Sequence, residues 1–173
     1  MQLAESLEVT IDREHRFGAH FDVCLAAATT TPKYDVARQL RKPVVTVDWL
    51  RASARGKKLA ALDRFIVPPF LGCIVSITGF MDLTRREQLK TEVEENGGTF
   101  SPDLVQGKCT HLIALKPEGD KYESARKWDI RIVSEKWLEN CVRAKANVGE
   151  ASYPVLKQRV IAPQVAKWVP PQL

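Results

Sequence analysis

Two lysines occupy the same place in a stretch that this chain contains twice. Lys33 lies in "PKYDVARQLRKPVVTVDWL" and Lys121 in "GDKYESARKWDIRIVSEKWL", and both stretches pass from Lys-Tyr through Ala-Arg to Trp-Leu. An ammonium group in a fixed place can bind an anion or, beside a suitable partner, take part in catalysis. Lys121 has no base or nucleophile nearby in the sequence, and the chain has no P-loop, nucleophile elbow or nucleotidyl-transfer lysine motif. The sequence therefore favours a binding protein over an enzyme.

The composition limits the kind of partner. The 173 residues are 45% hydrophobic and carry a formal net charge of +5, which favours an anionic partner, either nucleic acid or phosphorylated protein. No apolar run reaches membrane-spanning length and the N-terminus lacks a signal-peptide pattern, so we expect no membrane partner. The four cysteines form no CxxC pair and the three histidines have no ligand spacing. We expect buried thiols in a reducing compartment, with no metal and no cofactor.

The repeat has one ungapped register, obtained by shifting the sequence by 88 residues. The matched pairs are Lys33 with Lys121, Tyr34 with Tyr122, Ala37 with Ala125, Arg38 with Arg126, Val45 with Val133, Thr46 with Ser134, Trp49 with Trp137 and Leu50 with Leu138. We infer two copies of one small α/β unit. The expected division is a first unit at 1–58, a linker at 59–70, a second unit at 71–150 and a C-terminal extension at 151–173. Because Met1 lies opposite Leu89, we expect the first unit to lack its first strand.

The second copy predicts the element order β-α-β-β-α-β-α. Strands are expected at 71–78, 99–100, 109–115 and 130–133. The first helix is capped either by Asp82 or by a capping box of Thr84 with Glu87, and it ends at Gly97-Gly98. The second helix, 121–127, is expected to be capped by Asp120 and the third by Ser134.

This alternation of strands and helices predicts the fold class. It favours a mainly parallel sheet with helices on both faces. Each unit is expected to be a small, mainly parallel four-stranded sheet flanked by three helices, with the first unit incomplete at its N-terminus. Trp49 and Trp137 are expected to anchor the last helix of each unit to its sheet.

The second unit resembles a BRCT domain. Its "ENGGTFSPDL", "KCTHLIA", "KYESARKW" and "IVSEKWL" look like the successive motifs of that family. Two such units in tandem resemble the BRCT pairs that bind phosphopeptides. More narrowly, "PPFLGCIVSITGF" and "WLENCV" look like the N-terminal BRCT pair of the topoisomerase II-binding-protein type of replication and checkpoint scaffold, in a fungal-like form.

The resemblance implies a phosphate site. BRCT units of this kind hold phosphate with a Ser or Thr hydroxyl, the next backbone N–H and a lysine. The matching positions in the second unit are Thr78, Gly79 and Lys121, and Arg85 matches a position that adds a guanidinium. In the first unit only the lysine position, Lys33, can be seen.

Two aromatic residues follow the second lysine. Tyr122 and Trp128 are expected to wall the groove for the peptide residues beside the phosphate, although Trp128 could equally be a core residue. His111 is expected to be structural, because it lies in a strand-like apolar run.

The function implied by the resemblance is that of a nuclear, non-enzymatic adaptor in replication initiation and DNA-damage checkpoint signalling. Its clients would be the phosphorylated tail of the checkpoint clamp, phosphorylated initiation factors and a damage mediator. One alternative is a BRCT pair that binds DNA ends or DNA structures, which the mixing of acidic with basic residues weakens. The other is a scaffold that binds proteins without need of phosphate.

Overall fold

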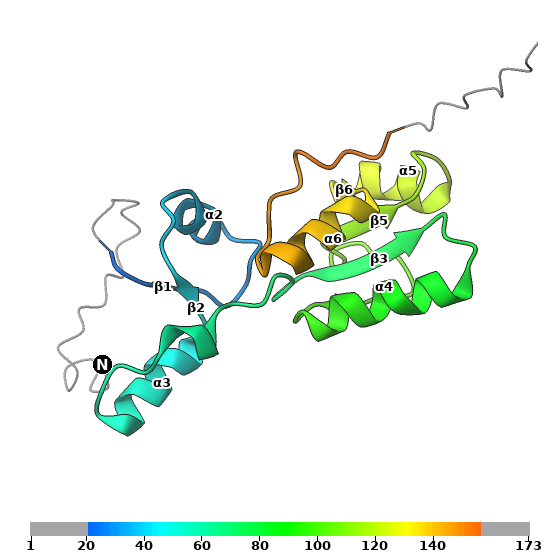
Figure 1. Cartoon of the computed structure of the whole chain (residues 1–173). Helices are drawn as coiled ribbons and strands as arrows, with labels where there is room; N and C mark the ends of the chain where they lie inside the picture. The colour runs from blue at the N-terminus through cyan, green and yellow to red at the C-terminus, as the bar shows by residue number, and fades with distance from the viewer. Residues whose placement is uncertain (1–20, 157–173) are drawn as a thin grey trace, which may run out of the picture.

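The structure, a computed structural model, describes residues 21–156 (Figure 1). The prediction that the first strand of the first unit is missing concerns residues outside this range, as does most of the predicted extension at 151–173. The first unit contains β1 (Cys24–Leu25), α2 (Pro32–Gln39), β2 (Val44–Val45) and α3 (Val47–Gly56). β1 and β2 pair in parallel, and the connector that follows carries the 3-10 helix η1 (Leu62–Phe65).

The second unit has the predicted order of elements. It contains β3 (Ile74–Thr78), α4 (Leu83–Glu95), β4 (Thr99–Phe100), β5 (His111–Ala114), α5 (Asp120–Lys127), β6 (Arg131–Val133) and α6 (Glu135–Ala144). Its sheet has the strand order β4-β3-β5-β6, and every pairing is parallel. The predicted α/β class with a parallel sheet is therefore confirmed.

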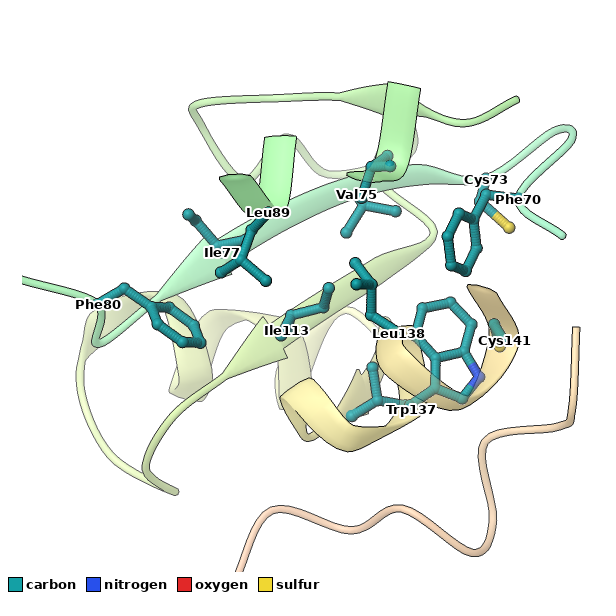
Figure 2. Close-up of a cluster of buried hydrophobic side chains, with 12 residues drawn as sticks. Phe70, Cys73, Val75, Ile77, Phe80, Leu89, Ile113, Trp137, Leu138 and Cys141 are labelled. Carbon is teal, nitrogen blue, oxygen red and sulfur yellow. The ribbon is translucent and has the colours of Figure 1, made fainter. Parts of the chain in front are cut away.

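The two faces of this sheet are covered by different helices. Because side chains alternate along a strand, Val75 and Ile77 of β3 share one face. They pack beneath α4 and α6 in a cluster of buried side chains, most of which Figure 2 labels: Phe70, Cys73, Val75, Ile77, Phe80, Leu89, Val93, Ile113, Val133, Trp137, Leu138 and Cys141. The opposite face is covered by α5, through a smaller cluster of Cys109, Leu112, Ala125 and Ile130.

The three residues predicted to cap helices have different outcomes. Asp82 caps α4, since its Oδ1 accepts the Thr84 N–H at 2.9 Å. Asp120 does not cap α5, which is a wrong prediction: Gly119, with φ 97°, occupies the cap position and Asp120 lies within the first turn. A carboxylate there still favours the helix through its dipole. Ser134 stands at the cap of α6, but its side chain makes no capping hydrogen bond.

The repeat extends beyond the residues that the sequences share. The Thr46 N–H donates to the Phe65 carbonyl at 2.8 Å, and the Ser134 N–H donates to the Tyr153 carbonyl at 2.9 Å. These two hydrogen bonds are 88 residues apart at both ends. In each unit, therefore, the segment after the last helix returns to the end of the last strand. Lys57 and Lys145, in the same register, both end their helices in the left-handed conformation.

The connector contributes to both cores. Val67, 2% exposed, packs in the first unit with Ala26, Tyr34, Ala37 and Val44, whereas Phe70, fully buried, belongs to the main core of the second unit. Only Pro68 and Pro69 separate Val67 from Phe70. The C-terminal end of the connector is thus packed against both units and is not a flexible tether.

The two units meet through buried polar side chains. Thr29 donates its hydroxyl to the Pro69 carbonyl at 3.1 Å, and its N–H donates to the Leu71 carbonyl at 2.8 Å. From the other side, the Asn147 N–H donates to the Tyr34 hydroxyl at 3.0 Å. Gly72, with φ 80°, lets the chain pass against Ala28, where a Cβ would lie 2.5 Å away. β3 begins at Ile74, three residues after the expected start at Leu71.

Two further properties bear on function. None of the helices in residues 21–156 is long and apolar enough to span a membrane, and this range holds no group of side chains suited to a metal ion. All four cysteines are free thiols, and burial raises the pKa of Cys73 to about 11 and that of Cys141 to about 12. These two thiols are therefore uncharged at neutral pH.

His111 is completely buried and belongs to the core. Its ring stacks on Trp137, with centroids 4.8 Å apart, and its Nε2 lies 3.0 Å from a Glu150 carboxylate oxygen. The Nδ1 lies 2.8 Å from the Thr110 hydroxyl. Burial lowers the pKa of His111 although Glu150 acts in the opposite direction, and the hydrogen bond with His111 lowers the pKa of Glu150.

The His111–Glu150 pair predicts a loss of stability in acid. In the unfolded chain the His111 imidazole takes up a proton near pH 6.5, whereas the buried imidazole of the folded chain resists protonation. The stability that neutral His111 contributes is therefore fully present above pH 6.5 and is lost as the pH falls below it. The Glu150 contribution is lost at still lower pH, below its ordinary pKa of 4.5. We expect His111→Phe, which keeps an aromatic ring, to flatten the fall in unfolding free energy between pH 7 and 5, measured by urea denaturation. His15 and His20 remain in both proteins, and unchanged pH dependence would contradict this assignment.

Gly98 lies where no side chain fits. An added Cβ would lie 2.8 Å from Val93 Cγ1 and 2.9 Å from Phe70 Cβ. We expect Gly98→Ala to lower the free energy of unfolding by about 1–3 kcal/mol, as overpacking a core does. The control is Gly56→Ala in α3, where the nearest atom to an added Cβ lies 3.9 Å away. That variant should be unchanged or up to about 1 kcal/mol more stable. An equal loss in both variants, measured by urea denaturation, would contradict the explanation.

Candidate functional site

The carboxyl ends of β3 and β5 form the edge at which the predicted phosphate residues lie. Thr78 is the last residue of β3 and pairs with Ala114, the last residue of β5. Lys121 follows in the first turn of α5. In parallel α/β sheets, ligands bind at this edge because loops and helix starts converge there.

The Lys121 ammonium lies beneath β3 and contacts only oxygen atoms of uncharged groups. Its Nζ donates to the Ile77 carbonyl and the Ser76 hydroxyl, each at 3.4 Å, and to the Pro102 carbonyl at 2.5 Å. It forms no ion pair with any residue between 21 and 156. The structure thus brings the lysine to the residue that precedes Thr78.

The electrostatic surroundings leave this lysine without a strong counter-ion. Partial burial lowers the pKa of Lys121; the Asp103 carboxylate opposes that effect, and the nearby Arg86 adds to it. A buried cation that lacks a paired carboxylate gains more from an arriving anion than a solvated one does. The surroundings therefore suit a negatively charged ligand at this place.

Gly79 makes the turn after Thr78 possible. Its φ is 85°, a conformation that residues with a side chain rarely adopt, and an added Cβ would lie 3.2 Å from Leu115 Cβ. The chain therefore leaves β3 close to the loop that leads to α5. Thr78 itself is partly exposed at this edge of the sheet.

Arg85 is held in an acidic network between α4 and α6. It donates to Glu135 and Gln88, and it lies 3.2 Å from a Glu92 oxygen and 3.9 Å from a Glu139 oxygen. Burial opposes the charge of Arg85, but Glu135 and Glu92 outweigh it and raise the pKa. The predicted contact of Arg85 with a phosphate stays a prediction, and the carboxylates would compete with that contact.

The other predicted residues occupy varied environments. Tyr122, on α5, is partly buried, and Trp128, at the end of α5, packs partly against the core cluster beneath that helix. Lys33, in the first turn of α2, is exposed. Trp49 is 5% exposed and Trp137 fully buried. The roles of Tyr122 and Trp128 in a peptide groove stay predictions.

Sequence reasoning missed four residues around this edge. Ser76 is buried and contacts Lys121, and a lone polar residue in the apolar run "LGCIVSIT" could have indicated it. Pro102 contributes a backbone carbonyl, which no side-chain pattern reveals. Met81 and Leu83 are 92% and 78% exposed beside the capping Asp82, where apolar side chains in a loop could have been noted.

The comparisons agree with this fold. The family model described as "twin BRCT domain" matches residues 73–137, which run from the start of β3 into α6. The chain therefore carries the pattern of the BRCT family in its second unit, and its fold is that of a tandem pair of BRCT units. It is 31% identical over 149 residues to the S-M checkpoint control protein rad4 of Schizosaccharomyces pombe, over 80% of this chain and 21% of that protein.

Other relatives and solved structures extend the likeness. A BRCT domain-containing protein of Arabidopsis thaliana is 37% identical over 129 residues, which are 69% of this chain and 10% of that protein. The chain thus spans about a fifth or less of these relatives. Rad4 BRCT1,2 in complex with a Crb2 phosphopeptide matches at a TM-score of 0.71 and 28% identity, covering 82% of this chain and 81% of that one. The complex with a Mdb1 phosphopeptide matches at 0.69 and 28%, covering 78% of each chain.

The Arg85 network predicts a measurable coupling to Glu135. Both side chains are about three-quarters buried, at 27% and 25% exposed, so their interaction is less screened than a surface pair. We expect a double-mutant cycle of Arg85→Gln and Glu135→Gln, measured by urea denaturation, to give a coupling of about 1 kcal/mol. The control cycle uses Lys90 and Glu87, an exposed pair on the same helix, and should give at most about 0.5 kcal/mol. Equal couplings would contradict the structural role of Arg85.

Proposed function

We propose that this chain is a non-enzymatic adaptor module that binds peptides containing phosphothreonine or phosphoserine. The second unit, residues 71–150, is the reader, and the first unit, 1–58, with the linker, 59–70, supports it. Residues 151–173 would be an extension to this pair. The chain would serve in replication initiation and DNA-damage checkpoint signalling in the nucleus, with phosphorylated checkpoint and initiation proteins as its clients.

One observation carries this proposal. The Lys121 ammonium donates to the Ile77 carbonyl, one residue before Thr78 and two before Gly79, and forms no ion pair with a carboxylate among the described residues. The similarity to Rad4 BRCT1,2, solved with Crb2 and Mdb1 phosphopeptides, supports phosphate as the anion that such an edge receives.

The chemistry suits a phosphate dianion. Lys121 would donate a charged hydrogen bond, Thr78 a hydroxyl and Gly79 its N–H, each worth about 1.5–3 kcal/mol when the acceptor is ionised. The side chain that glycine lacks leaves space for an oxygen near that N–H. Arg85 would add a fourth donor after exchanging Glu135 for the phosphate. Removing the phosphate removes these bonds, so phosphorylation acts as the switch.

Fluorescence polarisation tests the proposal. A degenerate phosphothreonine peptide pool should bind with a Kd near 1 μM, about −8 kcal/mol, and the unphosphorylated pool should bind at least tenfold more weakly. Lys121→Ala should weaken binding of the phosphorylated pool at least tenfold, or about 1.4 kcal/mol. Lys127→Ala, at the exposed far end of the same helix, is the matched control and should leave the Kd unchanged.

Variants of Thr78 and Lys33 distinguish the competing functions. Thr78→Val removes the hydroxyl while keeping the shape of the side chain, and Thr78→Ser should restore binding that the valine loses. Lys33→Ala should have little effect if the second unit alone is the reader. Equal affinity for both peptide pools would refute the adaptor proposal. Salt-titrated DNA binding would then be the next assay.

A further inference from the structure

A second concentration of positive charge lies between the two units, far from the predicted phosphate residues. A cavity of about 80 Å³ opens there, with Arg38 and Lys42 on the side of the first unit and Lys145 on the side of the second. Neither Thr78 nor Lys121 lines it. The cavity is therefore distinct from the edge at which β3 ends.

The charge lining this cavity is of one sign. No aspartate or glutamate is among its lining residues, and Arg38, Lys42 and Lys145 form no ion pair with any residue between 21 and 156. Part of this arrangement has a structural cause, because Arg38 lies in the last turn of α2 and Lys145 caps α6, where cations complement the helix dipole. Each helix end contributes only about half a negative charge. Three cations therefore leave an excess of about two positive charges among the lining residues.

The floor of the cavity is built from buried residues of both units. Tyr34 and Val67 are 2% exposed, Val44 is 5% and Ala146 is 4%. Burial raises the pKa of Tyr34, so its phenol stays neutral at physiological pH. The phenol oxygen accepts the Asn147 N–H, and no described residue accepts a hydrogen bond from this hydroxyl. A neutral donor thus lies beside three cations in a low-dielectric floor.

We propose that this cavity is a second oxyanion site, formed jointly by the two units, and that it takes a phosphate group. A dianion matches the uncompensated charge, and the fork of the Arg38 guanidinium suits phosphate oxygens. The volume is enough for one such group and too small for a peptide backbone with side chains. The phosphate is either the free ion or a phosphorylated side chain, and both offer the same oxygen atoms to the site.

An NMR titration tests this site without relying on Lys121. Inorganic phosphate is added to the chain at low ionic strength, with chloride as the matched salt, while the Ala146 and Asn147 amide signals are followed. We expect saturable shifts with phosphate and not with chloride. The variant Arg38→Gln/Lys145→Gln should raise the Kd from these shifts at least tenfold.

The repeat supplies a matched control. Arg126 and Lys57 are the partners of Arg38 and Lys145 at the 88-residue register, and Lys57 has the same left-handed backbone as Lys145. Arg126→Gln/Lys57→Gln removes the same charges and should leave the Kd unchanged. Equal weakening of phosphate binding in both double variants would show that the effect depends on net charge alone, and would overturn the proposal. The absence of saturable shifts in the wild type would overturn it as well. Amide dispersion in each spectrum checks that the variants are folded.

The Lys121→Ala background separates this inference from the proposed function. Shifts at Ala146 and Asn147 that persist in Lys121→Ala support an independent site, whereas their loss overturns it. In the same background, a singly phosphorylated peptide that reproduces the shifts identifies a phosphorylated side chain as a source. Shifts with inorganic phosphate alone identify the free ion. The inference can thus hold even where the second unit fails to read phosphopeptides.

Discussion

The position of α6 depends on one aromatic stack. The Trp137 ring centroid lies 5.2 Å from that of Phe70 in the connector (Figure 2) and 4.8 Å from that of His111 in β5. Trp137 thus joins the last helix to the sheet and to the segment before β3. Its indole N–H has no hydrogen-bond partner among the described residues, which costs about 1–3 kcal/mol. Burying about 150–250 Å² of ring contributes roughly 4–6 kcal/mol, so packing outweighs the unmet bond. Glu135, which holds Arg85, takes its place from this helix.

Two cations of the second unit show how local pairing separates structural from ligand-binding roles. Arg85 is surrounded by carboxylates on α4 and α6, and its charge is satisfied within the protein. Lys121 has only carbonyl and hydroxyl oxygens around it. These two environments follow from the placement of the helices, since α4 and α6 lie together on one face of the sheet and α5 lies on the other. Sequence position alone does not distinguish these environments.

Much of the second unit could be predicted, because its information is local. The apolar run before Thr78, the cap at Asp82 and the strand-helix alternation each depend on neighbouring residues. The segment that returns to Ser134 could not be predicted, since its hydrogen bond uses backbone groups that any sequence offers. Asn147 was missed for a related reason: a buried asparagine is identified by its partners in the other unit, not by its surroundings in the sequence.

The core residues on either side of the two prolines define how this chain can be divided. Val67 belongs to the first core and Phe70 to the second, and Leu71 packs against the first again, so the two cores share one short segment of the chain. A fragment that ended before Val67 would leave an apolar hollow in the first unit, and one that began after Phe70 would deprive Trp137 of an aromatic neighbour. Insertions, permutations and exchanges of single units would meet the same restriction. The pair, and not the unit, is the smallest piece that could pass intact from one protein to another.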